Sequence, residues 1–148
     1  SPRPRARMRE RDEAAAATEF RLALDEHMLG AGDMLSHCTD RLPPDAFRRL
    51  KRGELSAQEE LDLHGLGAVQ AQTLLRAFLA DARKHGIGCV RIIHGKGRRA
   101  AELDSSGAPI LKNLVDRVLR QRADVLAFHS APPAQGGTGA VVVLLAKR

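Results

Sequence analysis

The stretch ELDLHGLGAVQAQTLLRAFLADARKHGIGCVRIIHGKG (60–97) decides the fold, because it reads as a strand, a helix and a second strand. Its middle part carries apolar residues at helical spacing, and Gly86 ends that helix. The flanking parts, ELDLHG (60–65) and GCVRIIHG (88–95), are short apolar runs of strand length. A strand, helix and strand in this order form parallel neighbours through a right-handed crossover.

The remainder of the chain predicts one more helix and two more strands. A polar loop leads to Pro109, which is well placed to start a helix that ends at Arg122. DVLAFHSA (124–131) and AVVVLLA (140–146) then read as strands that can pair antiparallel. Each helix has a single apolar stripe. We therefore predict an α/β two-layer sandwich, with a mixed four-stranded sheet (βαβαββ) and two helices on one face.

The N-terminal part is less regular. Residues 1–12 contain five arginines and two prolines with little to bury, which predicts a disordered basic arm. Residues 13–60 predict a helical extension and linker, with a helix over 13–29 and short helical turns after Pro44. The regular domain is expected to occupy residues 61–148.

Composition limits the kind of partner and the kind of chemistry. The net charge of +6 favours a polyanionic partner, whereas an aromatic content of 3% argues against binding by rows of stacking rings. Cys38 and Cys89 match neither a disulfide framework nor a CxxC metal site, and they fit a reducing cytoplasm. No apolar run reaches the roughly 18 residues of a membrane helix, so no membrane partner is expected.

The two parallel strands deliver similar residues to one edge of the sheet. His64-Gly65 and His94-Gly95 both follow apolar runs, and ligands collect beyond the carboxyl ends of parallel strands. Lys96 and Gly97 extend the second turn into a glycine-flanked loop suited to phosphate. Arg98 and Arg99 follow directly and add positive charge to this loop.

Other interpretations of these residues are available. A His-Gly pair at a strand end is often just a turn, and glycine-rich turns can merely close a fold. Gly-Lys-Gly lacks the spacing of a P-loop, and His and Cys are too scattered for a four-ligand zinc site. His129, at the end of the third strand, either joins the edge or is a surface histidine.

Together these motifs resemble the Smr (small MutS-related) domain family. The resemblance covers about residues 61–146 and rests on LDLHG (61–65), IIHGKG (92–97) and the glycine-rich loop before the last strand in GGTGAVVVLL (136–145). It implies a fold similar to the C-terminal domain of bacterial translation initiation factor three. It also implies nucleic-acid cleavage, because Smr domains are described as nicking DNA and stand-alone bacterial members as cutting messenger RNA at stalled ribosomes.

The resemblance and the pattern at the strand ends together assign expected roles to particular residues. Asp62, His64 and His94 are the expected catalytic residues. The expected phosphate-binding or nucleic-acid-binding residues are Gly95, Lys96, Gly97, Arg98, Arg99, Gly137 and Gly139.

The leading hypothesis is a metal-independent RNA endonuclease that works by histidine acid–base chemistry. One imidazole would take the proton of a ribose 2′-OH and the other would protonate the leaving oxygen, since an ordinary histidine titrates near pH 6.5. Lys96 and the N–H groups of Gly95 and Gly97 would stabilise charge on phosphorus. No cofactor is expected for RNA, whereas cutting DNA would call for a divalent metal ion.

Two further hypotheses remain: DNA nicking, and a non-catalytic module that docks RNA or a ribosome. A ribosome would contact the N-terminal extension. The expected location is the cytoplasm, and the oligomeric state is unknown.

Overall fold

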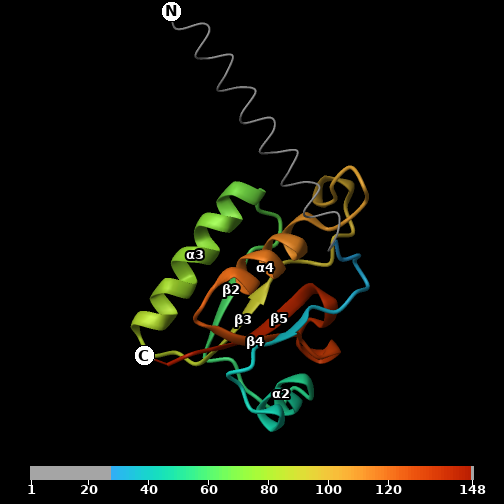
Figure 1. Cartoon of the computed structure of the whole chain (residues 1–148). Coiled ribbons are helices and arrows are strands. Elements are labelled where there is room, and N and C mark those ends of the chain that lie inside the picture. The colour runs from blue at the N-terminus through green and yellow to red at the C-terminus, as the bar shows by residue number, and fades with distance from the viewer. Residues whose placement is uncertain (1–27, 148) are drawn as a thin grey trace, which may run out of the picture.

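A computed structural model describes residues 28–147 and shows a mixed sheet of five strands in the order β1-β4-β5-β3-β2 (Figure 1). The strands are β1 (Ser36–Cys38), β2 (Glu59–Asp62), β3 (Cys89–Ile93), β4 (Val125–Ser130) and β5 (Ala140–Leu145). The helices are α2 (Pro44–Lys51), α3 (Ala68–Lys84) and α4 (Ile110–Gln121). Short 3-10 turns lie at 100–102, 133–135 and 137–139.

The predicted parallel unit is present. β2 pairs parallel with β3, and Asp62 lies opposite Ile93 where both strands end. β5 is inserted between β3 and β4 and runs antiparallel to both. β2, β3 and β4 consequently point the same way, and their carboxyl ends share one edge of the sheet.

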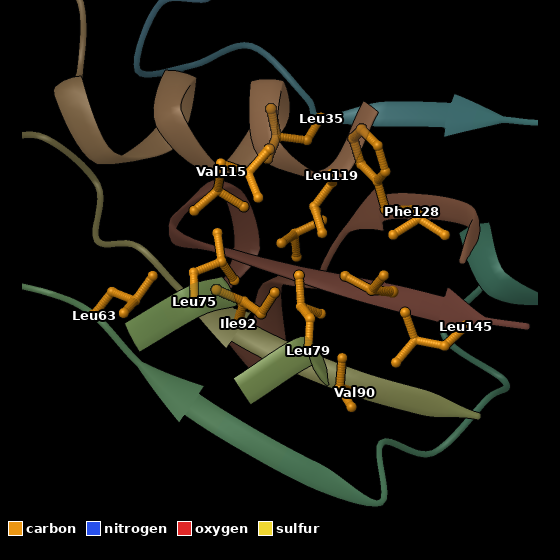
Figure 2. Close-up of a cluster of buried hydrophobic side chains, with 14 of the residues drawn as sticks. Leu35, Leu63, Leu75, Leu79, Val90, Ile92, Val115, Leu119, Phe128 and Leu145 are labelled. Atoms are coloured by element: carbon orange, nitrogen blue, oxygen red, sulfur yellow. The ribbon is translucent and has the colours of Figure 1, made fainter. Parts of the chain in front are cut away.

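Helices α3 and α4 cover one face of the sheet, as the sequence predicts (Figure 1). The core between them and the sheet is built from aliphatic side chains and Phe128 (Figure 2). On β3 this core takes Val90 and Ile92, which are alternate residues and are both fully buried. Each such burial contributes about 1.5–3 kcal/mol, so the register of β3 is strongly fixed.

The sheet is larger than the sequence predicts. β1 pairs antiparallel with β4 and adds a fifth strand at the edge. On the face opposite α3 and α4, Leu50 of α2 packs into a second cluster with Ala127 and Val142. Both β1 and α2 come from the stretch predicted to be an extension and linker, and both pack against the sheet. β1 escaped prediction because three residues are too few to show a period.

The segment before β1 is tied to α4 by polar side chains. Lys112 is 1% exposed, and its Nζ donates to the backbone carbonyls of Gly30, Ala31 and Asp33. Burial lowers the pKa of Lys112. The predicted basic arm (1–12) and most of the predicted helix over 13–29 lie outside the described residues, and Met28 and Leu29 are not helical.

Candidate active site

The last residue of β2 and the turn after it form a polar pair. His64 Nδ1 lies 2.6 Å from Asp62 Oδ1, and the backbone N–H of His64 donates to the same oxygen at 3.0 Å. The His64 side chain is 68% exposed and that of Asp62 is 46% exposed. Gly65 follows with a φ of +79°, a value that favours glycine, so the chain can turn sharply behind the imidazole.

This pair has a defined proton arrangement. An ionised carboxylate only accepts, so Nδ1 of His64 carries the proton, and in the neutral ring Nε2 then presents a lone pair. Partial burial alone would raise the pKa of Asp62, but the hydrogen bonds from the His64 ring and backbone outweigh it and lower that pKa. Asp62 is therefore an ionised acceptor that determines which ring nitrogen of His64 carries the proton.

The loop after β3 is held by the turn before β5. The Gly139 carbonyl accepts hydrogen bonds from the N–H groups of His94 and Gly95, both at 3.0 Å. A Cβ on Gly139 would lie 2.9 Å from Lys96 Cγ, so any larger residue there would force the Lys96 side chain to shift. The expectation that the Gly95 N–H faces a phosphate is therefore wrong, because that group is already bonded within the protein.

A cavity of about 860 Å³ lies beside this loop, and we call it the active-site cavity. It is lined by residues from the turn after β2, from β3 and the loop that follows it, and from the turns at 98–102 and 134–139. These include His64, Gly95, Lys96, Arg98, Arg99 and Gly139. Arg91 also lines it and donates to Glu60 and to the carbonyl of Gln135. Arg91 is compensated by Glu60, but Lys96, Arg98 and Arg99 also line the cavity with only one further carboxylate, that of Glu102, so the cavity suits an anion.

His94 lies on the opposite face of the sheet. It follows Val90 and Ile92 in the alternation of β3, so its ring points toward α3 and α4, and the residue is 3% exposed. Nδ1 lies 2.8 Å from the Gly95 carbonyl. Burial lowers the pKa of His94 to about 4, although that hydrogen bond acts in the opposite direction. The expectation of an imidazole that changes its charge near neutral pH is thus wrong for His94.

The remaining predicted residues have structural partners. Gly97 has a φ of +66°, and a Cβ there would lie 2.8 Å from Pro109, so glycine permits the loop to pack on the start of α4. The N–H of Gly137 donates to the carbonyl of Pro132, and neither Gly97 nor Gly137 lines the active-site cavity. His129 is 9% exposed, and its Nδ1 lies 2.9 Å from Ser36 Oγ, so it belongs to the interior beside α2.

Sequence reasoning missed Arg91 and the segment around Gln135. The alternation of β3 could have indicated Arg91, because it lies between the inward-facing Val90 and Ile92 and so faces the other side. Between residues 28 and 147, no group of three or more His, Cys, Asp or Glu residues is arranged to hold a metal ion. None of the helices in that range is long and apolar enough to span a bilayer.

Comparison with known proteins identifies the family of this domain. A family model of the Smr domain matches residues 61–146. A ribosome rescue factor SmrB of Pectobacterium carotovorum is 40% identical over 100 residues, which is 68% of this chain and 50% of that protein. A ribosome rescue factor SmrB of Tolumonas auensis is 31% identical over 141 residues, 95% of this chain and 75% of that protein.

A solved structure has a similar fold. YdaL, a stand-alone small MutS-related protein from Escherichia coli, aligns with a TM-score of 0.69 at 30% identity and covers 82% of this chain and 89% of its own. The chain spans about half the length of most of the curated relatives that it matches.

Proposed function

Because the chain belongs to the Smr domain family, we propose that it is an endonuclease that cuts RNA, and that its substrate is messenger RNA on stalled ribosomes. The observation that carries this proposal is the Asp62–His64 pair at the rim of a cavity lined by Arg91, Lys96 and other cations. The names of the SmrB relatives support the ribosome as the partner. Such a role also places the protein in the cytoplasm.

His64 is proposed as the general base. Its Nε2 takes the proton of a ribose 2′-OH, and the 2′-oxygen then bonds to phosphorus while the bond from phosphorus to the 5′-oxygen breaks. The products are a 2′,3′-cyclic phosphate and a 5′-hydroxyl. Asp62 orients the ring and stabilises the imidazolium that forms. General base catalysis of this kind contributes about 10²–10⁴-fold.

The cations are proposed to stabilise the transition state. Lys96 and Arg98 are exposed on the loop after β3 and face the cavity, so they offset the charge that gathers on the phosphoryl oxygens. His94 is buried and neutral, so we assign it no proton transfer to the leaving oxygen. Because His64 is exposed at the cavity rim, water reaches the site. A water molecule protonates the leaving 5′-oxygen, and the His64 imidazolium gives its proton to the hydroxide that remains, so the protons balance.

The test compares His64→Ala with His85→Ala on a labelled single-stranded RNA. His85 is a matched control, because it also lies beside an aspartate, with Nδ1 3.3 Å from Asp81 Oδ1, and is 59% exposed far from the site. We expect His64→Ala to slow cleavage by tenfold or more and His85→Ala to cut at the wild-type rate. Equal rates for the two variants would refute the assignment of His64.

The chemistry is tested separately on the substrate. Replacing the ribose at the scissile position with deoxyribose removes the 2′-OH and should stop cleavage, with or without a chelator. Continued cutting of that substrate would contradict the 2′-OH mechanism and favour DNA nicking with a metal-activated water. RNA that is bound but never cut would indicate a non-catalytic binding module.

A further inference from the structure

A second cavity adjoins the active-site cavity. We call it the side cavity; it has a volume of about 350 Å³ and is lined by residues 56–60, Arg91 and Gln135. Arg91 and Gln135 also line the active-site cavity, so the two spaces meet at these residues. A strand of RNA that leaves the active-site cavity on this side therefore passes Arg91.

The Arg91 guanidinium is held at this junction by its edges. Its Nε, at 2.8 Å, and its Nη2 both donate to Glu60 Oε2, and its Nη1 donates to the backbone carbonyl of Gln135 at 3.2 Å. Hydrogen bonds from N–H groups lie near the plane of the guanidinium, so these partners occupy its edges and not its flat faces. The side chain is 29% exposed, so a fixed, planar cation remains accessible to a ligand at the junction.

Arg91 lies one strand repeat away from the Asp62–His64 pair. Arg91 is opposite Glu60 in the parallel ladder, and two residues further along Ile93 is opposite Asp62. Side chains two apart in a strand share a face, so Glu60 and Asp62 lie on the side of the sheet to which Arg91 points. Two residues of a strand span about 7 Å, so a single nucleotide can reach both positions.

The charges of the two cavities separate a phosphate from a base. The side cavity has one cation, Arg91, and the two carboxylates of Glu59 and Glu60, so it disfavours a phosphate. The active-site cavity has the opposite balance, because Lys96 and two further arginines line it beside Glu102. A backbone whose scissile phosphate lies among those cations is therefore expected to place a base, and not a second phosphate, beside Arg91.

A flat cation is a suitable partner for a nucleobase. Proteins that bind single-stranded RNA stack its unpaired bases on aromatic rings or on the planes of arginine guanidinium groups. The chain has no Trp or Tyr, and no phenylalanine between residues 28 and 147 lines either cavity. Arg91 lines both cavities, so its guanidinium is placed to do what an aromatic ring does in other RNA-binding proteins.

We propose that Arg91 is a stacking platform for the base next to the scissile phosphate, and that this base lies in the side cavity. Glu60 and the Gln135 carbonyl fix the plane of the guanidinium, and its face contacts the base. This inference rests on the proposed action on RNA and adds a binding contact to it. Because every base has a π face, the platform accepts any base, which suits a nuclease that meets messenger RNA of any sequence.

The test measures binding, so it does not depend on cleavage. The full chain is titrated into two fluorescent 2′-O-methyl hexamers, one with bases and one abasic at every position, and the dissociation constants are read by anisotropy. Arg91→Lys keeps the charge but loses the plane, so it should bind the hexamer with bases about tenfold more weakly than the wild type and the abasic hexamer equally well. Arg76→Lys, on the exposed side of α3, is the matched control and should bind both hexamers as the wild type does.

A double variant removes the ion pair without changing the net charge. Arg91→Met with Glu60→Gln deletes one positive and one negative charge, and it should show the same loss for the hexamer with bases and none for the abasic hexamer. Equal losses for the two hexamers in both variants would show that Arg91 contacts phosphate or only supports the fold. Unchanged binding of the hexamer with bases would show that Arg91 contacts no base, and either result would overturn the proposal.

The two proposals fail in different ways. A base-dependent loss of affinity in a protein that never cuts RNA would leave the platform standing and remove the endonuclease function. Cleavage of RNA by a protein whose Arg91 variants bind both hexamers as the wild type does would do the reverse.

Discussion

Acid should destabilise this protein through His94 well above the pH at which carboxylates protonate. An ordinary histidine titrates near 6.5, whereas burial lowers the pKa of folded His94 to about 4. Below pH 6.5 the unfolded chain therefore binds a proton that the folded chain does not. The stability that comes from keeping this ring neutral is complete above 6.5 and is lost as the pH falls toward 4.

The size of the effect follows from those two values. The free energy of unfolding should drop by about 2 kcal/mol between pH 7.5 and pH 5, and by about 3 kcal/mol at pH 4, from His94 alone. His37 and His129 have pKa values that are lowered mainly by burial, so both add to the same trend. A comparison with His94→Gln isolates one residue, because glutamine does not titrate.

The measurement is urea unfolding of wild type and His94→Gln at pH 7.5, 6, 5 and 4. Above pH 6.5 the unfolding free energies of the two proteins should change with pH in the same way. Between pH 7.5 and pH 5 the wild-type protein should lose about 2 kcal/mol more than His94→Gln. NMR of the histidine ring protons gives the pKa of His94 directly. A ring that titrates near 6.5, or identical pH slopes in the two proteins, would refute the buried, neutral state and reopen a proton-transfer role for His94.

Three further predictions follow from single contacts. Asp62→Asn keeps the shape of the pair but replaces a charged group that only accepts with an amide that can also donate, so the His64 tautomer is no longer fixed. The cleavage rate should fall about 10–100-fold with unchanged RNA affinity, as separate rate and binding assays would show. Gly97→Ala should lower the free energy of unfolding by about 2–4 kcal/mol, because the new Cβ would clash with Pro109. The control is Gly107→Ala: Gly107 also has a positive φ, but a Cβ there would meet no atom within 4 Å, so the loss should be only about 1–2 kcal/mol. Equal losses in the two variants would contradict the clash with Pro109. Lys112→Met removes the donor to three backbone carbonyls, so the free energy of unfolding, measured in urea or by heating, should fall by about 2–4 kcal/mol. A loss below about 0.5 kcal/mol, the size expected for a surface substitution, would show that Lys112 does not hold the segment before β1.

The local sequence was sufficient to predict the elements that carry strong periodicity. α3, α4 and the apolar strands β3 and β5 each have a pattern that only one secondary structure can bury. The parallel order of β2 and β3 follows from the helix between them, and it brings Asp62 and His94 to the same edge of the sheet. Weakly patterned segments gave no such signal: β1 is a strand because β4 offers it hydrogen bonds.

The sequence by itself determined which residues reach this edge, since strand, helix and strand leave little choice of topology. Only the tertiary structure decided what each residue does there. His64 shares the side of Asp62 and stays exposed, whereas His94 shares the side of Ile92 and is buried under α3 and α4. The physical reason is that a strand places alternate side chains on opposite faces of the sheet, and the face that the helices cover is buried from solvent. Burial then lowers the pKa of His94, so that this imidazole stays neutral near neutral pH.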